Sequence, residues 1–215
     1  FFAVTILIAG IPHGALDHIV AKQNSKLQNR SFSHTQFYLT YLSRMALYGI
    51  CWYFLPSFAL LLFIVLSAFH FGETDLPLPA SIHKRSAIVL QTNYGLLIVL
   101  VLLLTHAQEV LSILTIIEKE NTVLLSVIFE PLNSILIILI IFSLLILNFI
   151  WQYRLHRLPL ERYLKISLRT ILILGIITSL PLPLAFAFYF GCWHSLHSLE
   201  NIRQHLSGSG SEHIS

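Results

Sequence analysis

Residues 132–151 read LNSILIILIIFSLLILNFIW, a stretch without a single charged side chain. An apolar helix of about 20 residues is long enough to cross the hydrocarbon core of a bilayer. The whole chain has the same character, with 56% hydrophobic and 11% charged residues among 215. A soluble domain carries about 25% charged residues. The sequence therefore predicts a protein that lies in a membrane.

Further apolar stretches follow one another along the chain. They lie at about residues 37–55, 56–71, 86–105, 163–180 and 183–206, and a shorter one occupies residues 1–12. Helices usually break at proline, so Pro56 is expected to separate 37–55 from 56–71, and Pro181 with Pro183 to separate 163–180 from 183–206. A spanning barrel would need alternating segments of about ten residues instead. We therefore predict an all-α, polytopic transmembrane helical bundle of about seven spans.

The domain organisation is expected to be simple. Residues 1–206 form a single transmembrane helical domain, and residues 207–215, rich in Ser and Gly, form a loop or a cut C-terminal tail. Residues 1–12 are too short to cross a bilayer, and residues 207–215 resemble a loop that should connect to a further segment. We therefore expect a fragment that lacks both ends of a longer protein. The stretch 113–129 is interrupted by charges and is interpreted as a loop with an interfacial helix.

The basic residues gather on one side of this threading. One side of the membrane holds the connections 19–36, 74–85 and 152–162 and the region after residue 205. Every Lys and Arg lies on this side or in the helix turns beside it, except Lys119, which lies on the opposite side with several glutamates. The positive-inside rule makes the basic side cytoplasmic and places the protein, multi-pass, in the cell (inner) membrane. A basic patch with interleaved aromatics is missing from the sequence, which argues against nucleic-acid binding. Cys51 and Cys192 are interpreted as small core residues without a disulfide.

Histidines occur in three segments that lie inside or at the end of apolar stretches. They are Pro12-His13-Gly14-Ala15-Leu16-Asp17-His18, Phe69-His70-Phe71-Gly72-Glu73-Thr74-Asp75 and Cys192-Trp193-His194-Ser195-Leu196-His197. The threading brings all three to the same depth, near the cytoplasmic side. Polar side chains there are costly unless paired or ligated, and imidazole is the commonest metal ligand. We predict a metal site, for which Fe(II), Zn and Cu all remain open.

The individual histidines differ in what they indicate. His194 and His197 share a helix face by their three-residue spacing, and a pair of core histidines hydrogen-bonded across helices is an equally good interpretation. His13 is favoured as a ligand and His18 stays open. The other histidines, in loops or interfaces, are interpreted as solvated: His34, His83, His106, His156 and His213.

Carboxylates and aromatic residues accompany these histidines. Asp75 and Glu73 follow His70 and would accept the second N–H of a ligating imidazole, although Glu73 could itself be a ligand. Asp17 has the corresponding place after His13, or caps the next helix. An aromatic lining could hold a long polyene, with plain packing as the alternative. Its candidate residues are Phe69, Phe71, Tyr189, Phe190 and Trp193.

At these residues the chain resembles the Brp/Blh family of membrane β-carotene 15,15′-dioxygenases. Residues 10–18 match the family motif G-x-P-H-G-A-x-D, residues 70–75 match H-F-G-x-x-D, and residues 189–195 match Y-F-x-x-x-H-S. The three motifs occur in the family's order. Their combination makes the resemblance specific.

The resemblance implies a non-haem Fe(II) enzyme that uses O₂ to split the central double bond of β-carotene into two all-trans-retinal molecules. It implies His13, His70 and His194 as iron ligands, with Asp17 and Asp75 orienting them, and needs no further acid or base. A fourth ligand in the family pattern H-S-x-x-H would fall on Ser198, so either His197 replaces it or a helix bulge adjusts the register. A retinal-binding rhodopsin would be the downstream partner.

Two other classes compete with this hypothesis. A membrane desaturase or hydroxylase with a di-iron histidine-box site would need about eight histidines in boxes, and only His194 and His197 come near that pattern. A metal or proton transporter would need polar residues through both halves of the membrane, whereas these histidines gather at one depth.

Overall fold

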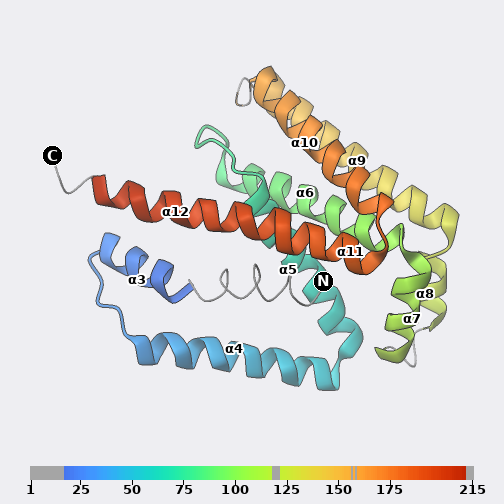
Figure 1. Ribbon diagram of the computed structural model, residues 1–215, viewed down its shortest axis with the longest axis horizontal. Helices are drawn as coiled ribbons and strands as arrows, with labels where there is room; N and C mark the ends of the chain where they lie inside the picture. Colours follow the sequence, from blue (N-terminus) through green and yellow to red (C-terminus); the bar gives the residue numbers. More distant parts are fainter. Residues whose placement is uncertain (1–16, 118–121, 156, 158, 212–215) are drawn as a thin grey trace.

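The structure, a computed structural model, describes residues 17–117, 122–155, 157 and 159–211. Every regular element in these residues is a helix, which confirms the predicted all-α class (Figure 1). In chain order they are α3 (Asp17–Leu27), α4 (His34–Phe54), α5 (Pro56–Asp75), α6 (Lys84–Leu104), α7 (Ala107–Ile117), α8 (Thr122–Ile128), α9 (Pro131–Arg154), α10 (Leu160–Ser179), α11 (Leu182–Phe186), the π-helix η2 (Ala187–His194) and α12 (Ser195–Ser211).

The helix boundaries follow local sequence signals. Ser33 caps α4 by accepting a hydrogen bond from the Gln36 backbone N–H at 3.3 Å. Prolines occupy the first turns of α5, α9 and α11, where their missing N–H costs nothing. The predicted breaks at Pro56 and Pro181 are therefore confirmed, because each proline starts a new helix or caps it.

The α5–α6 contact is the most extensive in the described molecule. It depends on two glycines at which the backbones nearly touch. A Cβ on Gly95 would lie 1.8 Å from the Ala68 carbonyl oxygen, and one on Gly72 would lie 1.7 Å from that of Gln91. Small residues permit this approach between membrane helices. α6 thereby becomes the central helix, with Leu90, Leu97 and Ile98 fully buried on it.

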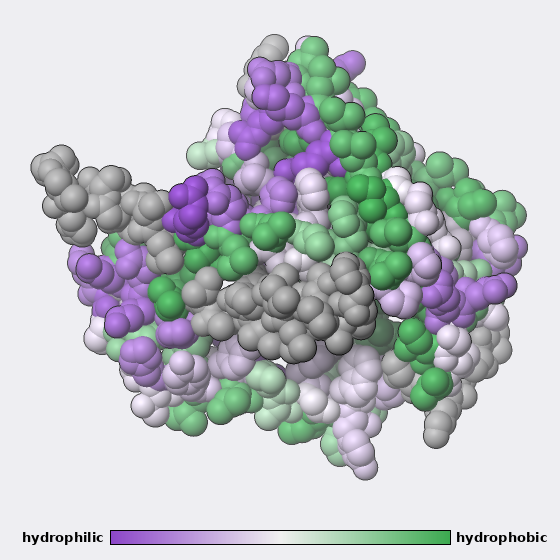
Figure 2. Space-filling model, in the orientation of Figure 1, coloured by the Kyte–Doolittle hydropathy of each residue, from purple (hydrophilic) through white to green (hydrophobic). Residues whose placement is uncertain are grey.

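In the part of the chain that the structure describes, three helices are long and apolar enough to cross a membrane: α5, α6 and α9. The predicted count of about seven spans is not confirmed by these three. Many apolar side chains face outward from the described helices, as on α4, which buries none of its residues. Figure 2 shows hydrophobic residues over much of the visible face and hydrophilic ones gathered over α3 and around the start of α10. Apolar surface on this scale is typical of a lipid-facing protein.

The stretch 113–129 contains parts of two short helices, α7 and α8, separated by residues outside the described ones. α7 has 11 residues and α8 has 7. At about 1.5 Å per residue, neither crosses a hydrocarbon core of about 30 Å. The prediction of a short helix in this stretch is confirmed.

Three details of the sequence interpretation were wrong. His106 is only 9% exposed rather than solvated, because its Nδ1 lies 2.8 Å from the Leu102 carbonyl oxygen and its Nε2 lies 2.7 Å from that of Leu180. The backbone at residues 207–211 continues α12 instead of forming a loop, because a helix already formed extends cheaply. Cys51 and Cys192 are free cysteines as predicted, but Cys192 is exposed and not a core residue.

We expect Gly95→Ala to disrupt the α5–α6 contact. The added methyl group would overlap backbone atoms of α5, which cannot rotate away as a side chain could. The membrane-extracted protein should lose several degrees of thermal stability, since overpacking costs about 1–3 kcal/mol. Gly175→Ala in α10 is the control, because a Cβ there meets nothing within 4 Å. Equal melting temperatures for the two variants would contradict the close contact.

Candidate metal centre

Two of the predicted ligands, His70 of α5 and His194 of η2, face each other. Their Nε2 atoms lie 3.3 Å apart and their ring centroids 5.0 Å apart, although the residues are 124 positions apart in sequence. His194 is buried at 3% exposure, while His70 is exposed. The pair therefore has one side within the protein and one that a small molecule can reach.

Asp75, the last residue of α5, contacts the His194 ring on the side opposite His70. Its Oδ1 lies 3.1 Å from Nδ1 of His194, and its Oδ2 accepts a hydrogen bond from the Tyr189 hydroxyl at 2.9 Å. The carboxylate is completely buried. A carboxylate that accepts this hydrogen bond places a proton on Nδ1, and in the neutral ring that leaves the Nε2 lone pair facing His70.

The π-helix explains how Tyr189 and His194 reach the same carboxylate. Residues five apart point about 140° away from each other in an α-helix of 3.6 residues per turn. A π-helix bonds residue i to i+5 and so aligns this spacing. η2 ends with the Ser195 backbone N–H bonded to the Phe190 carbonyl, five residues earlier. π-Helical segments occur frequently at functional sites.

His197 does not join the pair in the described structure. Its Nδ1 lies 3.1 Å from the Trp193 carbonyl oxygen and its ring stacks on Trp193 at 4.6 Å. Within residues 17–117, 122–155, 157 and 159–211, no group of three His, Cys, Asp or Glu side chains is arranged to hold a metal. The π-helix η2 ends at His194, and the chain continues from Ser195 as the α-helix α12, so the described structure has no helix bulge between His194 and Ser198. Ser198 is consequently the buried residue one turn after His194.

Two further predicted site residues cannot be placed with the pair. His13 lies outside the described residues, as does the side chain of Asp17. Glu73, predicted as an orienting group or a ligand, is exposed. The predicted carboxylate that contacts a histidine ring in the described structure is Asp75, whose partner is His194.

The predicted aromatic lining separates into two kinds of residue. Phe71 and Tyr189 are buried and pack edge to face, with centroids 5.5 Å apart. Phe71 also contacts the His194 ring at 4.8 Å, so it forms an apolar wall against this imidazole. Phe69, Phe190 and Trp193 are only partly buried. These three are the ones that an apolar substrate could contact.

Two residues of the site were missed in the sequence. Arg169 of α10 donates a hydrogen bond from Nη2 to the backbone carbonyl of Asp75, and its guanidinium lies 5.8 Å from the centre of the Trp193 ring. Tyr94 of α6 is fully buried and lies near Arg169 and Asp75. A cation within the apolar stretch 163–180 was the available signal for Arg169. It was interpreted there as one more membrane-flanking basic residue.

Comparison of the sequence with known proteins identifies the family of this chain. A sequence model described as beta-carotene 15,15′-dioxygenase matches residues 4–213. A curated protein of that name from the uncultured marine bacterium 66A03 is 29% identical over 120 residues, which are 56% of this chain and 42% of the relative. The match thus spans less than half of that relative, and no solved structure matches significantly. Because the family model matches almost the whole length, the chain belongs to the beta-carotene 15,15′-dioxygenase family.

Proposed function

We propose that this protein is an iron-dependent membrane oxygenase that cleaves the central 15,15′ double bond of β-carotene with O₂ to give two all-trans-retinal molecules. The family supports the reaction. The single observation that supports a metal centre is the pair of facing Nε2 atoms of His70 and His194, 3.3 Å apart.

The geometry of this pair fits a shared metal ion. Imidazole nitrogens bind a first-row ion such as Zn²⁺ at about 2.0–2.1 Å, which separates two neighbouring ligand nitrogens by about 2.8–3.4 Å at octahedral to tetrahedral angles. The Asp75 carboxylate behind His194 supplies the usual partner of a ligating imidazole, which fixes its tautomer and orientation. The residues present therefore fit the ion that the family implies.

The proposed ligands are His13, His70 and His194, with His197 as the fourth. His197 would have to leave its stack on Trp193 to bind. Asp75, and by the same logic Asp17, would orient the imidazoles, while Glu73 remains an alternative outer group. When bound, Fe(II) would supply the activation of O₂.

The protein's own residues would contribute positioning and exclusion of water. By accepting a hydrogen bond from Nδ1–H, Asp75 would keep the proton of the His194 ring on Nδ1, so that Nε2 could bind the metal through its lone pair. Phe71 shields the His194 ring on its apolar side. The polyene would enter from lipid and lie against Phe69, Phe190 and Trp193, which positions its central bond by proximity rather than by acid–base chemistry.

The location of the site supports a cytoplasmic orientation. Asp75 ends α5, and α6 begins with Lys84 and Arg85 after a short connection. Arg162 donates to the Pro77 carbonyl in this connection. Since cytoplasmic loops collect Lys and Arg, we propose a multi-pass protein of the cell membrane with its metal centre toward the cytoplasm.

Expression of the full-length gene in a β-carotene-producing bacterium tests the reaction. We expect the cells to lose their colour and to accumulate retinal, measured by chromatography, with two retinals formed per β-carotene consumed. Purified protein should contain about one iron per chain, whereas a stoichiometry near two would favour a di-iron enzyme. Divalent-metal flux into liposomes without retinal formation would favour a transporter.

His70→Ala should abolish retinal formation and reduce bound iron strongly, because it removes one member of the facing pair. His34→Ala is the matched control, since His34 begins α4 and is exposed. The variant His197→Ala tests whether His197 is the fourth iron ligand. Iron loss close to that of His70→Ala would assign it as a ligand, and wild-type iron content would exclude it.

Asp75→Asn should lower metal affinity by about 10–100-fold, the usual effect of losing an outer partner of a ligating histidine. The amide could donate to Nδ1 of His194, which would put the proton on Nε2 and turn it away from metal binding. Glu200→Gln provides the same carboxylate-to-amide change on exposed α12, where Glu200 pairs with Arg203 at 2.7 Å. Unchanged iron affinity in Asp75→Asn would contradict the orienting role.

A further inference from the structure

Arg169 lies in an unusual place for a cation. It belongs to α10 within a mostly apolar stretch, is only partly exposed, and its Nη2 donates to the backbone carbonyl of Asp75. Its guanidinium lies over the Trp193 ring, 5.8 Å from the centroid. Arg169 therefore contacts the helix that carries His70 and the residue next to His194. Charged residues in such surroundings are costly and are typical of functional sites.

The Asp75 carboxylate needs a nearby positive charge. It is completely buried, and its two oxygens are bonded to a tyrosine hydroxyl and an imidazole. Neither partner carries a full charge when His194 is neutral, and a buried uncompensated anion is strongly destabilising. Arg169 reaches the same residue through its backbone carbonyl, which places the guanidinium charge beside Asp75.

The surrounding polar groups are mostly donors. Within the described residues, the Tyr94 hydroxyl, Arg169 Nε and Trp193 Nε1 are buried without a hydrogen-bond partner. Each of these atoms can donate, and each lies at or near the contact of Arg169 with Trp193 and Asp75. The carboxylate itself is bonded to Tyr189 and His194. Arg169 is therefore the cation that links these buried polar groups to the end of α5.

We propose that Arg169 is a positioning residue for the metal centre. Its contact with the end of α5 and its charge beside Asp75 hold the carboxylate that orients His194, so its loss would weaken metal binding through His194. The inference rests on the proposed metal centre and assigns Arg169 no contact with substrate.

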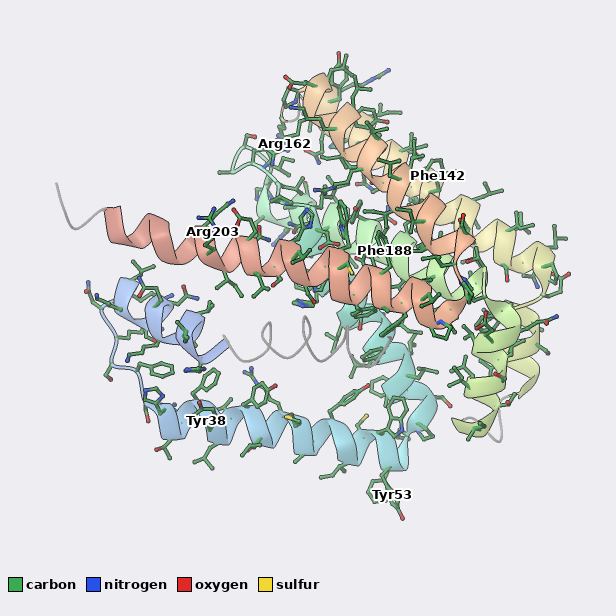
Figure 3. The ribbon with its side chains drawn as sticks, viewed as in Figure 1. Tyr38, Tyr53, Phe142, Arg162, Phe188 and Arg203 are labelled. Atoms are coloured by element: carbon green, nitrogen blue, oxygen red, sulfur yellow. The ribbon has the colours of Figure 1, made fainter. Side chains whose placement is uncertain are left out.

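Arg162 offers a matched control on the same helix. It lies seven residues before Arg169, about two turns away, and therefore on the same face of α10. Its Nη2 also donates to a backbone carbonyl near the end of α5, that of Pro77. Figure 3 shows Arg162 at the end of α10, beside the α5–α6 connection. The two arginines thus share an anchoring role, but only Arg169 contacts Asp75 itself and Trp193.

The test compares wild type, Arg169→Gln, Arg169→Lys and Arg162→Gln in the full-length protein, titrated with Co²⁺ after metal removal. The readouts are the Co²⁺ dissociation constant and the visible absorption spectrum of the bound ion, which reports ligand arrangement. We expect Arg169→Gln to bind about 10–100-fold more weakly with a shifted spectrum. Arg169→Lys, which retains the charge, should lose less affinity, and Arg162→Gln should resemble wild type.

Each contrary result has a distinct meaning. Wild-type affinity and spectrum in Arg169→Gln would overturn the proposal, as would an equal loss in Arg162→Gln, which would reduce Arg169 to a helix anchor. If Arg169→Gln does not fold, Arg169→Met decides, because it also removes the charge while its apolar stem suits the stretch 163–180, and unchanged affinity and spectrum there would overturn the proposal. A wild-type protein that binds no Co²⁺ would overturn the metal centre itself.

Discussion

The arrangement of the site depends on one buried carboxylate. Asp75 joins the end of α5 to η2 through two separate partners, the Tyr189 hydroxyl and the His194 imidazole. Its contact with Nδ1 of His194 also determines which ring nitrogen faces His70. Because the carboxylate is completely buried, water does not compete for these hydrogen bonds. The bond thus serves both the packing of the helices and the chemistry of the imidazole.

Asp75 and His70 are positioned by the packing of α5 on α6. Gly72 and Gly95 allow the two backbones to approach closely, and Gly72 lies between His70 and Asp75 on α5. A bulkier residue at either glycine would move the helix that carries both site residues. Close packing is rigid, so small displacements there are transmitted to the site. The position of the site is therefore a consequence of helix packing in the membrane protein's centre.

Much of this could be predicted from the sequence. The apolar stretches predicted the helices α4, α5, α6, α9 and α10, and the prolines predicted their breaks, because these signals are local. His70, His194 and Asp75 were identified from histidines and a carboxylate in unfavourable surroundings, and the first two now lie together. His106 was misinterpreted because one of its two carbonyl partners, that of Leu180, is 74 positions away in sequence.

By itself, the sequence determined the helical class, the apolar character and the identity of the ligand candidates, since composition and spacing are properties of short segments. Only the tertiary structure decided that Tyr189 and His194 share one carboxylate and that Arg169 lies beside it. The reason is that these contacts span about a hundred residues, from Asp75 to Arg169, Tyr189 and His194, and depend on a π-helix and on the crossing of α5 with its neighbours. Neither feature leaves a periodic signal in the sequence.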